Sequence, residues 1–143
     1  MEQLIEKMKE LQATAFSLYL KAHNYHWNVT GPNFSEYHEF FGEFYTNVWE
    51  SVDAYAENIR KLGAFAPGSL QRFAELSEIE DELMVPAANV MFARLTAGND
   101  TLIEELYETA DMAEELNQRG LVNFLEGQID IHEKHRWMLK SFQ

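Results

Sequence analysis

The sequence predicts an all-α fold, a bundle of four long helices, and three observations lead to this prediction. Four stretches of roughly 22 to 31 residues carry hydrophobic residues at helical spacing. Only three prolines and seven glycines occur among the 143 residues, which favours long uninterrupted helices over many short strands. The connection between the second and third stretches is long enough to hold a short helix of its own. A single domain over residues 1–143 accommodates all of these elements.

The first helix is expected from about Glu2 to Trp27. Its hydrophobic residues recur at alternating steps of four and three and form one stripe, which consists of Leu4, Met8, Leu11, Ala15, Leu18, Ala22 and Tyr25. A neighbouring stripe carries Phe16, Tyr19, His23 and His26. The segment from Gly31 to Asn33 contains glycine and proline, so it breaks the helix and leads through a short turn into the second one.

The second helix is expected to begin at Ser35, a residue type that caps helix N-termini, and to reach Leu62, with Gly63 at its C-terminal end. Its apolar stripe consists of Phe41, Tyr45, Val48, Val52, Ala56 and Ile59. Residues Ala64 to Val85 then form a long crossover. A short apolar-periodic piece from Ser69 to Leu76 predicts a small helix inside it.

A third helix is expected after Pro86, a residue type that suits the first helical position, and continues to about Leu116. A break near residues 117–120 leads to the fourth helix, from Leu121 to Phe142. Two helical hairpins joined by a long crossover are the arrangement of ferritin-like bundles. The expected fold is therefore a ferritin-like four-helix bundle with a short extra helix in the crossover between helices 2 and 3.

Composition limits the chemistry that the chain can perform. Because there is no cysteine, a disulfide scaffold, a zinc–thiolate site, an iron–sulfur cluster and a cysteine nucleophile are excluded, and any metal must be held by nitrogen and oxygen ligands. The net charge of −13 attracts metal cations and argues against nucleic-acid binding, although a merely soluble surface is an equal alternative. Without a signal sequence or an apolar run of about 18 residues, a cytoplasmic protein outside the membrane is expected.

Four side chains of the first two helices are suitable ligands for a first-row metal: His26, His38, Asp53 and Glu57. His26 ends the first helix and His38 opens the second, so the two imidazoles are expected at the same end of the hairpin. Asp53 and Glu57 are four residues apart and therefore share one helix face. Packed or capping histidines and a solvated acidic face are the alternatives to a metal site.

Helix geometry decides how these four residues could meet. His38 and Asp53 are fifteen residues apart on one helix, which places them about 22 Å apart along its axis, too far to bind one metal within one chain. A second chain packed antiparallel across a two-fold axis would bring its carboxylates to the histidines of the first and create two such sites. The Glu-x-x-His pattern of a di-iron site inside one bundle precedes none of the five histidines. An intersubunit site is therefore the favoured candidate.

Three motifs together resemble the signature of the Dps family of mini-ferritins. They are the run HNYHWNVTGPNFSEYHEFF, the run VDAYAENIRKLG and the closing segment HEKHRWMLKSF, and the resemblance covers the whole chain. It implies an iron storage and detoxification protein, a hollow dodecamer of four-helix subunits. Such a protein acts as a ferroxidase that oxidises Fe(II) with hydrogen peroxide, or more slowly with dioxygen, stores the ferric mineral and protects against oxidative damage.

Carried over motif by motif, the resemblance assigns ligands for an iron pair: His26 and His38 from one subunit, with Asp53 and Glu57 from its partner. Trp27 and Trp137 match aromatic residues near the site, and His23 is an accessory candidate. Outside this set, His132 and His135 share one stripe of the last helix. We expect them to be core or interface histidines, with metal binding as the alternative.

This chain departs from the family pattern in three places. Gly42 stands where many members carry an aspartate four residues after the second histidine, so the second iron position is expected to be weak unless His23 or a water compensates. Arg119 and Asn123 stand where aspartates line a three-fold pore, which leaves the route of iron into the shell open. The basic N-terminal tail of DNA-binding members is missing. A non-catalytic metal-sequestering shell and, less favoured, a DNA-protecting protein are the alternative functions.

Overall fold

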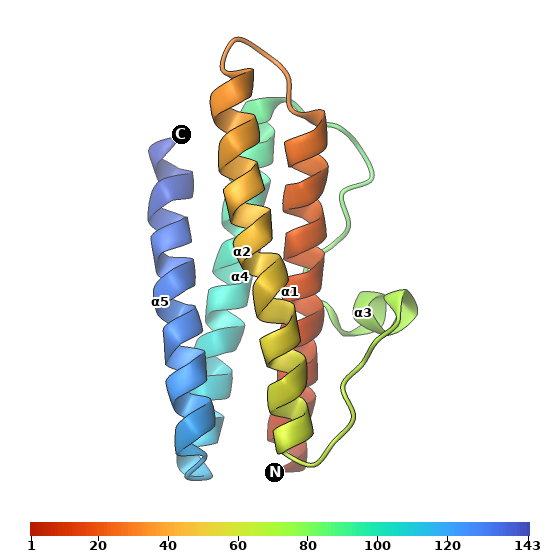
Figure 1. Cartoon of the computed structure of the whole chain (residues 1–143), viewed down its shortest axis with the longest axis vertical. Helices are drawn as coiled ribbons and strands as arrows, with labels where there is room; N and C mark the ends of the chain where they lie inside the picture. Colours follow the sequence, from red (N-terminus) through yellow and green to blue (C-terminus); the bar gives the residue numbers. More distant parts are fainter.

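Four long helices run side by side along the longest axis of the molecule (Figure 1). The computed structural model describes all residues from Met1 to Gln143. Its helices are α1 (Glu2–Asn28), α2 (Phe34–Lys61), α3 (Leu70–Leu76), α4 (Ala88–Glu115) and α5 (Arg119–Ser141). In Figure 1, α1 rises and α2 descends, the crossover with α3 returns the chain to the upper end, α4 descends and α5 rises. The predicted bundle of two hairpins joined by a crossover with a short helix is confirmed.

The helix boundaries correct the sequence-based expectation at three starts. Helix α5 begins at Arg119, two residues before the expected Leu121. Helix α2 begins at Phe34 after Asn33, one residue before Ser35, and has no side-chain cap. The turn before it contains Gly31 at φ 121°, a conformation that favours glycine. Helix α4 begins at Ala88, so Pro86 precedes the helix and does not occupy its first position. The short helix α3 agrees with the prediction, and Ser69 Oγ accepts a hydrogen bond from the Arg72 N–H at its start.

The core follows the predicted α1 stripe throughout and the predicted α2 stripe in part. On α2, Phe41, Val48 and Ile59 are buried, whereas Tyr45, Val52 and Ala56 are half-buried and Phe44 and Tyr55 are buried in their place. Every residue of the α1 stripe is fully buried: Leu4, Met8, Leu11, Ala15, Leu18, Ala22 and Tyr25. At the end of the bundle where α1 meets α2, four phenylalanine rings pack in one cluster, Phe40, Phe41, Phe92 and Phe142. Burying side chains of this size contributes about 2 kcal/mol each. The cluster therefore gives a rigid support to the hairpin that carries the histidines. None of the helices combines the length and the apolar character that a membrane span requires.

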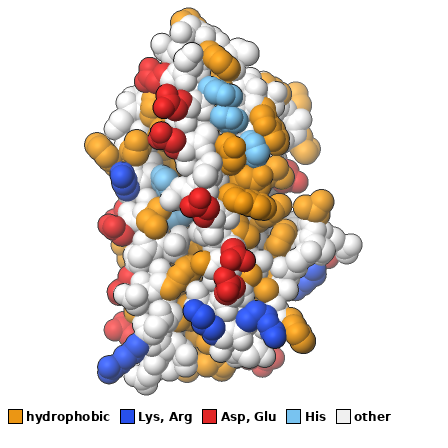
Figure 2. All heavy atoms as spheres, viewed as in Figure 1, with side chains coloured by type: hydrophobic (Ala, Val, Ile, Leu, Met, Phe, Trp, Pro, Cys, Tyr) orange, Lys and Arg blue, Asp and Glu red, His pale blue; other side chains and the backbone are white.

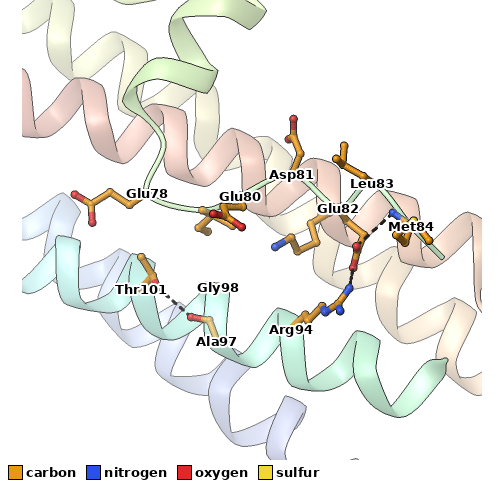
Figure 3. A pocket seen from close by; sticks show the side chains of 12 residues that line it. Glu78, Glu80, Asp81, Glu82, Leu83, Met84, Arg94, Ala97, Gly98 and Thr101 are labelled. Carbon is orange, nitrogen blue, oxygen red and sulfur yellow. Dashed lines mark hydrogen bonds and ion pairs between the residues drawn. The ribbon is translucent and has the colours of Figure 1, made fainter. Parts of the chain in front are cut away.

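The crossover is attached to the bundle by a partly hidden carboxylate. Glu82 Oε1 accepts hydrogen bonds from Tyr25 Oη and from Arg94 Nη1, each at 2.6 Å. Figure 3 shows Glu82 turned toward Arg94 across the groove between the crossover and α4, whereas Asp81 points away from the bundle. The Tyr25 hydroxyl, ahead of the Arg94 guanidinium, keeps the pKa of Glu82 below its usual value. Because Tyr25 precedes His26, this attachment also steadies the end of α1.

We expect Glu82→Gln to lower the free energy of unfolding by about 2 kcal/mol, because two hydrogen bonds to a charged acceptor become bonds to a neutral amide. Chemical denaturation of the two proteins at equal concentration measures the difference. Glu80→Gln, an exposed change of the same charge on the same segment, is the matched control. Equal stabilities of the Glu82 and Glu80 variants would show that the crossover is held by other contacts.

Candidate metal site

The hairpin between α1 and α2 holds His26 and His38 as a reciprocally bonded pair. His26 Nδ1 lies 2.7 Å from the backbone oxygen of His38, and His38 Nδ1 lies 2.7 Å from the backbone oxygen of His26. The rings stack with centroids 3.8 Å apart and an interplanar angle of 17°. A carbonyl only accepts hydrogen bonds, so both Nδ1 atoms carry the proton and both Nε2 atoms keep a free lone pair. This is the orientation in which imidazoles bind metals.

A third histidine lies beside this pair in an aromatic enclosure. The His23 ring lies between Trp27 and Tyr45, with centroid distances of 3.8 Å to each, and its Nδ1 lies 2.9 Å from Tyr19 Oη. Its ring centroid is 6.0 Å from that of His26. Burial, followed by repulsion from His26, lowers the pKa of His23 and favours a neutral imidazole. The accessory candidate His23 is thus close to the pair without being part of its hydrogen bonds.

The two carboxylates form a second group further along α2. Asp53 and Glu57 are both exposed, one helical turn apart. Hydrogen bonding to Asp53, and then repulsion by its charge, raises the pKa of Glu57. The two groups therefore compete for a proton, and a cation placed between them would relieve the same repulsion. Paired carboxylates with this property are suitable ligands for a divalent metal.

The structure brings the histidines together and the carboxylates together, but it does not bring the two groups to each other. Within one subunit, no three His, Asp or Glu side chains are grouped so that they could hold a metal ion. Both groups nevertheless lie on the face formed by α1 and α2. In Figure 2, histidines gather near its upper end, acidic side chains lie lower, and hydrophobic side chains fill the space between them. The chain presents two half-sites on one surface.

The hydrophobic side chains between the half-sites include rings that the sequence analysis did not assign to the site. Tyr19 lies 4.8 Å from Trp49 and 6.0 Å from Tyr45, measured between ring centroids, and Trp49 is 52% exposed. The spacing of Tyr19 and His23, and of Tyr45 and Trp49, four residues apart in each case, is a signal in the sequence that could have identified this cluster. The other accessory candidate, Trp137, lies on α5 and is 66% exposed.

The remaining residues singled out from the sequence lie elsewhere. Arg119 and Asn123, at the start of α5, line a groove together with Glu114 and Glu126. His132 is fully buried, and its Nδ1 lies 2.7 Å from Asn99 Oδ1. Burial lowers the pKa of His132 to about 3. A neutral histidine with an amide partner in the interior agrees with the expected core role.

Comparisons with known proteins identify the family. Residues 5–143 match the family model described as the ferritin-like domain. DNA protection during starvation protein 2 of Bacillus anthracis is 30% identical over 141 residues, which cover 99% of this chain and 97% of that protein. A Dps protein from Bacillus brevis has a crystal structure that is similar with a TM-score of 0.95 at 30% identity, over 99% of this chain and 95% of that one.

A Dps protein from Vibrio cholerae O1, described as a member of a broad superfamily of ferritin-like diiron-carboxylate proteins, is similar with a TM-score of 0.95 at 26% identity, over 99% of this chain and 89% of that one. The likeness thus extends over all four long helices and the crossover, in sequence as well as in fold. With its paired histidines and paired carboxylates on the first hairpin, the chain belongs to the Dps family of ferritin-like proteins.

Proposed function

We propose that this protein is a ferroxidase that oxidises Fe(II), with hydrogen peroxide or dioxygen as the oxidant, at sites shared between two-fold-related subunits. The ferric product would be stored inside a hollow homododecamer, which would protect the cell from oxidative damage. Family membership supports a function of the iron-storage or DNA-protection type. The single observation that carries the finer proposal is the pair of half-sites on one face: Nε2 atoms of His26 and His38 at one end, Asp53 and Glu57 at the other.

A two-fold contact of this face would complete both half-sites at once. If two α2 helices pack antiparallel with the axis between the half-sites, the histidines of each subunit meet the carboxylates of the other, so each dimer has two sites. The exposed rings around Trp49 lie between the half-sites, where such an axis would pass. Aromatic residues of this kind are enriched in protein–protein interfaces. The hydrophobic patch would therefore be the centre of the contact, with the metal sites at its two ends.

Each group of the completed site would have a defined role. The Nδ1–H bonds would fix the imidazoles so that their Nε2 lone pairs bind Fe(II), and the two carboxylates would bind the metal through their oxygens, which relieves the repulsion between them. Imidazole nitrogen and carboxylate oxygen are a ligand set that suits Fe(II). Two Fe(II) ions each give one electron to one peroxide, whose O–O bond breaks to give water or hydroxide. A paired two-electron transfer of this kind avoids the release of hydroxyl radical.

A non-catalytic shell is the second candidate function, and Gly42 is the observation that favours it. Many family members carry a carboxylate at this place, whereas this chain has no side chain there at all. Such a shell would hold one metal tightly and oxidise it slowly. DNA protection, which the names of relatives mention, is disfavoured by the net charge of −13, since an acidic surface repels phosphate. We therefore do not propose DNA binding.

Titration of the assembled, metal-free protein with Fe(II) under anaerobic conditions, followed by hydrogen peroxide, distinguishes the two functions. We expect rapid oxidation with about two Fe(II) consumed per site, because the ligand set resembles that of di-iron carboxylate proteins. Bound iron is counted by the titration, and its oxidation is followed by the absorbance of ferric iron. One tightly held iron per site that reacts slowly would contradict the enzyme and support the shell.

A further inference from the structure

The imidazole of His26 lies directly against the backbone of α2 at Gly42. A Cβ atom built on Gly42 would be 3.1 Å from Cε1 and 3.1 Å from Nδ1 of His26, closer than the 3.4–4 Å of ordinary contact. The φ angle of Gly42 is not positive, so its backbone does not require glycine. Glycine inside a helix costs about 1 kcal/mol relative to alanine. We therefore look for the advantage of glycine in the space beside the His26 ring, which a Cβ atom would otherwise fill.

That space is used by one edge of the His26 ring. Nδ1 reaches the backbone oxygen of His38, which lies one helical turn before Gly42, at 2.7 Å. Nδ1 and Cε1, the two atoms that a Cβ would approach, belong to the same ring edge. The ring is also held by its stacking with His38 at 3.8 Å and lies 5.2 Å from Tyr45. A side chain at position 42 must therefore displace the edge that makes the hydrogen bond.

We propose that Gly42 is a positioning residue for His26: the absence of a side chain lets Nδ1–H bond the His38 carbonyl, which holds the Nε2 lone pair on the face of the half-site. That this lone pair binds iron rests on the proposed function. In this role Gly42 does more than mark the absence of a carboxylate ligand. An aspartate there would bring a Cβ that moves His26 outward by a few tenths of an ångström, so the chain has a better-fixed first imidazole in place of an additional carboxylate.

Gly42→Ala tests this role without adding a ligand. We expect the variant to fold with equal or greater stability, because alanine is the better helix former. Fe(II) affinity measured anaerobically on the assembled protein should fall about tenfold or more, the usual effect of losing a partner that orients a metal-binding histidine. The matched control is Gly127→Ala on α5, where a built Cβ meets nothing within 4 Å. This control gains the same helix stability from the change of glycine to alanine, and it should leave the Fe(II) affinity unchanged.

A second measurement needs no metal. Nitrogen-15 spectra of histidine side chains, recorded at a pH where the imidazoles are neutral, report which ring nitrogen carries the proton. The His26 signals are identified by their loss in His26→Gln. The parent protein and Gly127→Ala should show His26 protonated on Nδ1 alone, and Gly42→Ala should show a mixture of the two tautomers. Because His26, His38 and Gly42 belong to one subunit, the tautomer measurement does not depend on whether the subunits are assembled.

Two results would overturn the proposal. One is a Gly42→Ala protein whose His26 tautomer and Fe(II) affinity both equal those of the parent. The other is a Gly42→Asp protein that binds a second iron while its first site is unchanged, because Gly42 would then be only a missing carboxylate. Failure of the proposed function has a different signature: the parent protein would bind no Fe(II) through its histidines, while the tautomer comparison would still report on Gly42.

Discussion

Subunits carrying both His26→Ala and His38→Ala are expected to assemble normally and to oxidise Fe(II) on the order of 100-fold more slowly than the parent protein. Both substitutions remove half-buried side chains from the end of a hairpin whose core is built by other residues, so the fold should persist. Subunits carrying Asp53→Ala and Glu57→Ala should be equally slow, since each variant lacks one half-site. Stopped-flow absorbance after mixing with Fe(II) and peroxide measures both rates.

Co-assembly of the two slow variants should restore activity, and this is the most direct test of a site shared between subunits. In a mixed pair, the histidines of one chain face the carboxylates of the other, and one of the two sites is complete. Random pairing of equal amounts makes half of the pairs mixed, so about a quarter of all sites should be active.

The control mixes the histidine variant with a chain that carries all four alanine substitutions. No complete site can form in that mixture, and its rate should stay at the level of the separate variants. Mass spectrometry verifies that the oligomers contain both chains. Verified mixed oligomers of the first kind that remain inactive would show that the four residues do not act together across a subunit contact.

Glu105→Gln is expected to make the protein markedly more stable at alkaline pH. Glu105 is 4% exposed; Thr14 donates a hydrogen bond to its Oε1 at 2.8 Å, and its Oε2 has no partner. Burial raises the pKa of Glu105 from its usual 4.5 to about 8, and the nearby acids Glu78 and Glu10 act in the same direction. The folded state therefore keeps a proton that the unfolded chain has already released over this range.

The direction of the pH effect follows from that difference. Between about pH 4.5 and pH 8 the folded state binds more protons at Glu105 than the unfolded state does, so stability falls as the pH rises through this window. The loss is about 5 kcal/mol per subunit at most, since each unit of pKa corresponds to about 1.4 kcal/mol. Glutamine cannot ionise and can still accept from Thr14. The variant should match the parent near pH 4.5 and exceed it increasingly toward pH 8.

Denaturant unfolding at fixed protein concentration across this range checks the prediction, because oligomers change apparent stability with concentration. Glu104→Gln, the exposed neighbour on the same helix, removes the same charge and should show no such divergence. Curves for Glu105→Gln and the parent that stay parallel from pH 4.5 to pH 8 would show that the buried carboxyl is already solvated or paired in the folded state.

Much of the fold could be predicted because the hydrophobic spacing alone determines it. The α1 stripe, the crossover helix and the two hairpins follow from residues that repeat at helical steps. The starts of α2 and α4 were misplaced because Ser35 and Pro86 were treated as local signals. Such residue types predict a helix start only to within one or two residues, and in the folded chain Asn33 and Ala87 are the residues that precede the two helices.

The candidate residues, and their separation into two groups within one subunit, were predictable from the sequence, but the internal geometry of the histidine pair was not. Ligand chemistry and helix rise are properties of His26, His38, Asp53 and Glu57 and their spacing. The reciprocal bonds from each Nδ1 to the other residue's carbonyl depend on how closely two helices approach. At Gly42 the His26 ring lies where a side chain would otherwise stand, whereas in the sequence this glycine indicates only an absent carboxylate.

The separation of the two half-sites within one subunit has a consequence for the timing of iron chemistry. A free subunit offers a metal two imidazoles or two carboxylates, but never all four groups together. Under the proposed function, iron and the second subunit therefore strengthen each other's binding by the same factor, as thermodynamic linkage requires. Newly made chains would oxidise little iron before they pair, so the ferric product would appear only once subunits have begun to assemble into the shell that is to receive it.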